Sequence, residues 1–208
     1  MAICYMCDQR GSTREHVPPL SFFPAPHRTN LWTVRSCPQH NNDNALDVEY
    51  VRNAIVMDIK NSGTALSAAQ QRVLASFLHS PTLFDQTFRE ITEFEHEGEE
   101  YVAWRNDLDR FNQVMKAIAH GVYYKLFNKR INRDWAIFYS SMHTPLSIQG
   151  RPDGFERLRQ IPQYLSLTEV RTPEPDVFQC AYEQWEEGQV FFRFIFYIGC
   201  EVHALSKE

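Results

Sequence analysis

The sequence predicts an α+β fold. Apolar residues recur at helical spacing through the middle of the chain and fall on alternate positions near its C-terminus, as in amphipathic helices and in strands. With 208 residues, 43% of them apolar and 23% charged, the chain has the composition of a globular protein with a sizeable core. We expect a small module over residues 1–60, followed by an accessory α+β region over residues 61–208.

The first sixty residues predict the order strand, strand, helix. Residues 15–17 are expected to form a strand that Pro18 and Pro19 stop, because proline cannot continue a hydrogen-bonded ladder. The β-branched and aromatic residues of 31–34 predict the returning strand. From Cys37 onward apolar residues recur every four positions, which predicts a helix.

The remaining elements follow from periodicity and turn residues. Amphipathic spacing predicts helices, alternation predicts strands, and Gly-containing turns predict hairpins. The expected elements are helix 65–78, which Pro81 ends, hairpin 88–104 turning at Glu97-Gly98, helix 107–126 capped by Asp107, strand 135–141, helix 154–161, and a C-terminal antiparallel hairpin of strands 177–185 and 189–202.

Two short pairs of metal-ligating residues lie within the first forty positions. Cys4 and Cys7 have two residues between them, and so do Cys37 and His40. Each pair can supply two corners of a tetrahedral zinc site. Three thiolates and one imidazole leave no open coordination position, so the sequence predicts a structural Zn²⁺ that stabilises a module with little core of its own.

The residues between and beside these pairs suit metal-assisted hydrolysis of a phosphodiester. His16 has the pKa range of a general base. A carboxylate at Glu15 and an amide oxygen at Asn41 suit a hard cation such as Mg²⁺ or Mn²⁺. Because successive strand residues point to opposite faces, Glu15 and His16 share one site only if the strand bends near Pro18.

In this order and spacing the motif resembles the HNH, or His-Me finger, endonucleases of the zinc-stapled ββα-metal type. It reads Cys4-Tyr-Met-Cys7, Glu15-His16-Val-Pro-Pro, Asn30-Leu and Cys37-Pro-Gln-His40-Asn41, and the matched region spans residues 4–52. The resemblance implies that His16 is the general base and that Glu15 and Asn41 hold one divalent ion. It also implies that Asn30 braces the loop between the strands.

The motif departs from the family pattern at two positions. His40 stands where most members have cysteine, and zinc accepts either ligand. Glu15 replaces the commoner aspartate, and its extra methylene moves the carboxylate outward.

Charge bears on the substrate. Arg14, Arg28 and Arg35 surround the motif and are expected either to contact nucleic-acid phosphates or to be a solvated surface. The net charge of −5 lowers the expected non-specific affinity for a polyanion. The acidic stretch 93–100 is interpreted as a solvated hairpin, with a partner surface or a nucleic-acid mimic as alternatives.

The sequence therefore predicts a metal-dependent HNH endonuclease acting on DNA, with RNA as an open alternative. A second hypothesis is a non-catalytic zinc-stapled module that binds nucleic acid or protein. A third is a nuclease that acts only with a partner subunit or as a homodimer, for example in antiviral defence. The longest apolar stretch is far shorter than the roughly 18 residues of a membrane span and no signal peptide is evident, so we expect a cytoplasmic protein without membrane contact.

Overall fold

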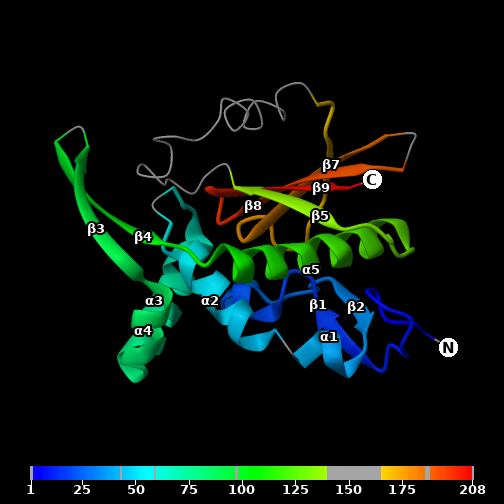
Figure 1. Ribbon diagram of the computed structural model, residues 1–208, viewed down its shortest axis with the longest axis horizontal. Coiled ribbons are helices and arrows are strands. Elements are labelled where there is room, and N and C mark those ends of the chain that lie inside the picture. Colours follow the sequence, from blue (N-terminus) through cyan, green and yellow to red (C-terminus); the bar gives the residue numbers. More distant parts are fainter. Residues whose placement is uncertain are drawn as a thin grey trace.

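The computed structural model describes residues 2–42, 44–58, 60–96, 98–139, 165–185 and 188–207. Within these ranges the chain has mixed α and β structure, with a five-stranded antiparallel sheet and two separate two-stranded ribbons. One long helix, α5 (Leu108–Phe127), lies between this sheet and the N-terminal elements (Figure 1). It contacts α2 and β2 on one side and β5 and β9 on the other.

The N-terminal elements follow the predicted order. Strands β1 (Thr13–His16) and β2 (Thr33–Ser36) pair antiparallel, with His16 opposite Thr33. Both strands lie about two residues away from the segments expected. The short 3₁₀ helices η1 (Leu20–Phe22) and η2 (Ala25–His27) occupy the loop between them.

The predicted first helix is divided into α1 (Pro38–Asn42) and α2 (Ala45–Val56). Seven consecutive residues at the end of α2 are buried, from Tyr50 to Val56. They include Arg52 and Asn53, which hydrogen-bond each other at 2.6 and 3.0 Å. The C-terminal half of α2 is thus enclosed on all sides, whereas its first turns are partly exposed.

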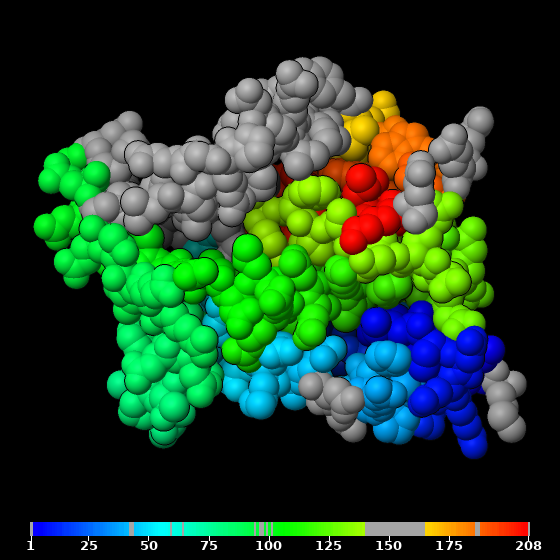
Figure 2. Space-filling view, in the orientation of Figure 1, coloured from blue at the N-terminus to red at the C-terminus, as the bar shows by residue number. Residues whose placement is uncertain are grey.

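The middle of the chain forms a helical pair and a ribbon. Helix α3 (Thr64–His79) and the ribbon of β3 (Arg89–His96) and β4 (Glu99–Arg105) confirm the predicted helix and hairpin. The ribbon extends away from the other described elements (Figure 1). In the space-filling view it lies with α3 at one end, and the N-terminal residues lie at the other (Figure 2).

Helix α4 (Pro81–Thr87) was not expected from the sequence. Pro81 ends α3 as predicted, but it also occupies the first turn of a new helix, where its missing N–H costs nothing. Phe84 and Phe88 pack edge-on against Phe77 of α3, with ring centroids 5.5 and 5.4 Å away. Helix α4 is stabilised by these ring contacts with α3. The segment is too short for its apolar spacing to predict a helix.

Helix α5 confirms its prediction closely. The Asp107 side chain accepts a hydrogen bond from the N–H of Arg110 at 3.2 Å and caps the helix. Of the six residues whose spacing predicts its apolar stripe, Phe111, Val114, Met115, Ile118 and Val122 are buried and Leu126 is half-buried. Asn128 ends the helix in the left-handed conformation, with φ of 51°.

The C-terminal region is a larger sheet than the predicted hairpin. Its strands are arranged in the order β5-β9-β8-β7-β6. They are β5 (Trp135–Tyr139), β6 (Thr168–Val170), β7 (Phe178–Gln184), β8 (Val190–Phe196) and β9 (Cys200–Ser206). The predicted helix 154–161 and the end of the predicted strand 135–141 lie outside the described residues.

The prediction of one strand over 189–202 was wrong, because the chain reverses between β8 and β9. Tyr197 and Ile198 have positive φ, 46° and 63°. The Tyr197 hydroxyl donates a hydrogen bond to the backbone carbonyl of Phe22. A Cβ at Gly199 would lie 2.0 Å from the carbonyl oxygen of Lys60, so only glycine permits this approach.

One buried hydrophobic cluster runs from the N-terminal elements through α5 into the sheet. It includes Cys4 and Tyr5 at one end and Val202 and Ala204 at the other. Among the residues that the structure describes, no helix combines the length and the apolar character needed to cross a bilayer.

Helix α5 packs tightly at Gly121 against Val17, the residue that follows β1. A Cβ there would lie 2.6 Å from Cγ2 of Val17, which is itself buried.

We expect Gly121→Ala to reduce the free energy of unfolding by about 1–3 kcal/mol through overpacking, although alanine favours helices over glycine by about 1 kcal/mol. Urea denaturation measures the change. The double variant Val17→Ala/Gly121→Ala removes the clashing methyl groups of Val17, so it should recover part of the lost free energy of unfolding. If Gly121→Ala alone is as stable as the original chain, the packing of Gly121 against Val17 is contradicted.

Candidate metal centre and adjoining pocket

Four side chains converge next to β1 and β2. We call them the Cys3His cluster: their ligand atoms all lie within 4.8 Å of one another, and they belong to Cys4, Cys7, Cys37 and His40. The Sγ atoms of Cys7 and Cys37 are 3.8 Å apart, and Nδ1 of His40 lies 3.6 Å from Sγ of Cys4. Sulfur ligands about 2.3 Å from a tetrahedral zinc lie about 3.8 Å from each other. The donor set and its spacing therefore fit zinc.

Short backbone contacts form the two halves of the cluster. The N–H of Cys4 donates to the carbonyl of Gln9 at 2.9 Å, which closes the first turn. The N–H of Tyr5 donates to the carbonyl of Arg35 at 2.9 Å and ties this turn to β2. Cys37 follows β2 directly, and His40 lies one turn later on α1. The end of the hairpin thus brings both ligand pairs together.

Thiol ionisation also suits a metal at this place. Burial opposes ionisation of Cys4, but nearby N–H groups, that of Met6 foremost, outweigh it and lower the pKa of this thiol to about 6. The thiolate is the form that binds zinc. Burial raises the pKa of Cys7, which a bound zinc would offset because coordination favours the deprotonated ligand.

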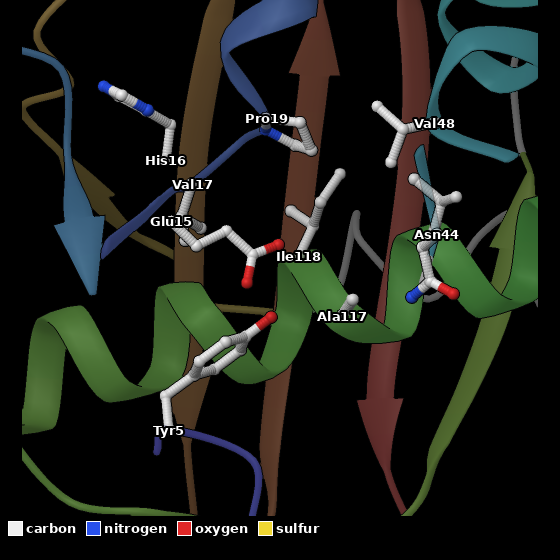
Figure 3. Close-up of a pocket in the computed structure, with 10 residues that line it drawn as sticks. Tyr5, Glu15, His16, Val17, Pro19, Asn44, Val48, Ala117 and Ile118 are labelled. Atoms are coloured by element: carbon white, nitrogen blue, oxygen red, sulfur yellow. The ribbon is translucent and has the colours of Figure 1, made fainter. Parts of the chain in front are cut away.

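A pocket adjoins the cluster on the side that faces α5. We call it the Glu15 pocket (Figure 3). It is lined by Tyr5, Glu15, His16, Val17, Pro19, Asn44, Val48, Val114, Ala117 and Ile118. Its walls therefore come from the first cysteine turn, β1, α2 and α5.

The Glu15 carboxyl points into this pocket, toward the hydroxyl of Tyr5 (Figure 3). Burial raises the pKa of Glu15, and hydrogen bonding with Tyr5 and Ser36 offsets part of that effect. Its Oε2 atom is buried and has no hydrogen-bond partner in the described part of the chain. A buried carboxylate oxygen without a partner is costly, and a cation would satisfy it.

His16 also lines the pocket, but its imidazole points away from the Glu15 carboxylate (Figure 3). The two side chains leave β1 on opposite faces, as alternation along a strand requires. Burial, followed by the positive charge of Arg28, lowers the pKa of His16. The imidazole is therefore neutral near pH 7 and able to accept a proton.

The structure separates the asparagines singled out from the sequence. Asn41 lies on α1, where its N–H donates to the carbonyl of Cys37 at 3.1 Å, and it is not among the residues that line the pocket. Asn44 does line the pocket, and as N-cap of α2 it makes no capping hydrogen bond with its side chain. Asn30 is exposed and has a φ of 54°, a conformation that asparagine tolerates better than most residues.

Two site residues were therefore not found from the sequence, Tyr5 and Asn44. Tyr5 lies between two zinc ligands, and a middle residue of such a pair gives no signal of its own chemistry. Asn44 belongs to the run Asn41-Asn-Asp-Asn44, in which the sequence does not show which amide faces the pocket.

The arginines lie on the face of the hairpin that carries His16. Arg14 and Arg35 are directly opposite each other on β1 and β2, and both are exposed. Two like charges in this position repel each other, and a bound anion would relieve the repulsion. Arg28 is exposed and donates from Nε to the carbonyl of Phe23 at 2.9 Å. The solvent face of the hairpin is thus basic.

The opposite, inward face of the hairpin presents oxygen atoms to the pocket. Oxygen ligands suit Mg²⁺ or Mn²⁺, and the pocket offers the orphaned Oε2 of Glu15 and the amide of Asn44. Comparison of the chain with known protein families, with curated proteins and with solved structures finds no match.

Removal of one cysteine tests the Cys3His cluster. We expect Cys37→Ser to abolish stoichiometric zinc binding and to lower the melting temperature, because the remaining three ligands no longer close a tetrahedral site. Metal content by atomic absorption and melting followed by circular dichroism measure the two effects. Cys180→Ala removes a buried thiol from the sheet, far from the cluster in sequence, and should keep the zinc. Zinc retained in full by Cys37→Ser would show that the four residues do not form one site.

Proposed function

We propose that the chain is a metal-dependent endonuclease of the HNH type that hydrolyses phosphodiester bonds in DNA. The main observation in its support is that the Cys3His cluster lies beside a pocket lined by Glu15, whose buried Oε2 has no hydrogen-bond partner among the described residues, and by His16, whose pKa is lowered. The resemblance of residues 4–52 to zinc-stapled HNH endonucleases supports the same reading. Clusters of titratable groups shifted from their ordinary pKa values are typical of catalytic sites.

In this proposal His16 accepts the proton of the attacking water as a neutral imidazole. Glu15 and an asparagine amide hold the catalytic ion, while Arg14, Arg28 and Arg35 bind flanking phosphates. A divalent ion supplies charge neutralisation at the phosphate and the leaving oxygen. Because the imidazole points away from Glu15, the proposal requires rotation of the His16 side chain toward the pocket when substrate binds.

His16→Ala tests the proposed base. We expect it to reduce plasmid nicking in the presence of Mn²⁺ by about 10²–10⁴-fold, the usual contribution of a general base. Zinc content and melting temperature should stay unchanged, because His16 makes no contact with the Cys3His cluster in the interactions described above. His79→Ala is the matched control, since this exposed histidine ends α3 away from the pocket. Equal nicking by both variants would remove His16 from the mechanism.

The asparagine ligand is identified by two further variants. The structure favours Asn44, which lines the pocket, and the resemblance favours Asn41. We expect one of Asn41→Ala and Asn44→Ala to raise the Mn²⁺ concentration needed for half-maximal nicking about tenfold or more, as loss of a metal ligand should, and the other to leave it within about twofold. No change in either variant would show that no amide from this segment holds the ion.

A second candidate function is a zinc-stapled module that binds nucleic acid without cutting it. Two observations favour it: Val114, Ala117 and Ile118 of α5 close the pocket around Glu15, and the His16 imidazole faces the basic side of the hairpin. Salt-dependent DNA binding by the pure protein, together with no cleavage in any divalent ion, would identify this function. Cleavage that appears only after a partner is added would instead support a nuclease subunit.

A further inference from the structure

Tyr5 connects the two sites described above. It lies between Cys4 and Cys7, so a bound zinc would fix its backbone on both sides. Its N–H is hydrogen-bonded to the carbonyl of Arg35 at 2.9 Å, and its residue is only 2% exposed. The position of the phenol ring is thus set by the zinc-ligating turn and by close packing.

The hydroxyl of this ring meets the Glu15 carboxyl. Figure 3 shows the two groups directed at each other across the floor of the pocket. Burial raises the pKa of this carboxyl, and the side chains of Tyr5 and Ser36, which both lie near it, lower that pKa. Ser36 is fully buried and directly precedes Cys37, and its hydroxyl donates a hydrogen bond to the Cys37 carbonyl at 3.2 Å. Each half of the Cys3His cluster therefore brings one hydroxyl group to Glu15.

This arrangement leaves one carboxylate oxygen ready for an ion. Oε2 of Glu15 is buried and has no hydrogen-bond partner among the described residues, so this atom has no bond to give up when an ion binds. A carboxylate ligand held by an outer hydrogen bond loses less rotational freedom when it takes a metal, and it presents a fixed lone pair. Tyrosine suits this role because its ring has few rotatable bonds and its hydroxyl donates a single hydrogen.

We propose that Tyr5, assisted by Ser36, is a positioning residue that orients Glu15 toward the divalent ion. This inference rests on the proposed function and deepens it. Zinc bound by Cys4 and Cys7 would fix Tyr5 between them, and Tyr5 would in turn orient the Glu15 ligand of the second metal site. The alternative is that Tyr5 only fills the core. That role predicts a change in stability but none in ion affinity once the protein is folded.

The test compares Tyr5→Phe with Tyr50→Phe in the zinc-loaded full chain. Tyr50 is an equally buried tyrosine, and its hydroxyl accepts a hydrogen bond from the Asp107 N–H at 2.8 Å instead of facing Glu15. Mn²⁺ is titrated into each protein without nucleic acid, and free Mn²⁺ is measured by electron paramagnetic resonance. Zinc content and melting temperature are recorded on the same samples.

We expect Tyr5→Phe to bind Mn²⁺ about 10–100-fold more weakly than the original chain, the usual effect of removing a partner of a metal ligand, while Tyr50→Phe keeps its affinity. Saturating Mn²⁺ should restore nicking by Tyr5→Phe to within about threefold of the original rate, which it cannot do for His16→Ala, because a positioning role acts through ion occupancy.

Unchanged Mn²⁺ affinity in a zinc-loaded Tyr5→Phe variant would overturn the inference and leave the proposed nuclease intact. If the original chain itself binds no Mn²⁺ beyond the zinc, both the inference and the proposed ion site fail. If Tyr5→Phe does not retain zinc, the Mn²⁺ titration is repeated with Ser36→Ala. Ser36 lies on β2, and its replacement by alanine removes one hydroxyl group only. Unaltered affinity in Ser36→Ala would then overturn the inference.

Discussion

The convergence of Cys4, Cys7, Cys37 and His40 into one Cys3His cluster is the constraint on which the N-terminal elements depend. The cluster joins a turn at residues 4–7 to the end of β2 and the start of α1, and a metal bound to all four ligands would hold these three segments together. Hairpin β1–β2 has only four residues in each strand, and a ribbon this short is marginal alone. A metal that binds only the folded arrangement contributes its binding free energy to folding. The positions of Tyr5, Glu15 and Asn41 all follow from this constraint.

Helix α5 supplies the second constraint. It is the shared wall between the N-terminal elements and the sheet, and its contact with Val17 at Gly121 sets how near β1 can come. Because its apolar stripe closes the Glu15 pocket, a carboxylate that a hairpin alone would leave in water is largely buried. The same helix therefore stabilises the fold and determines the electrostatics of the candidate site. The two faces of β1 differ for this reason: Glu15 faces the core, whereas His16 and Arg14 face the basic surface.

The sequence predicted what local patterns determine. The Cys3His cluster followed from ligand spacing, α5 from an apolar stripe with an Asp107 cap, and the β3–β4 ribbon from turn residues at Gly98. It did not predict features that need contacts between distant residues. The turn after Phe196 depends on Phe22 and Lys60, and α4 depends on rings packed against α3. In the candidate site, Glu15, His16 and both zinc pairs could be named, but the roles of Tyr5 and Asn44 depend on which side chains face the pocket.

The β3–β4 ribbon has backbone groups on both long edges that pair with no further strand among the described residues. Unpaired strand edges can hydrogen-bond with a strand of another chain, and this pairing leads to aggregation. Exposed carboxylates lie along the ribbon at Glu90, Glu93, Glu95 and Glu100. Glu90 is paired with Arg105, whereas Glu95 stands directly opposite Glu100. An incoming copy of the same ribbon would bring further negative charge against them. The acidity of this ribbon thus opposes self-association through its edges, at the cost of some repulsion between its own carboxylates.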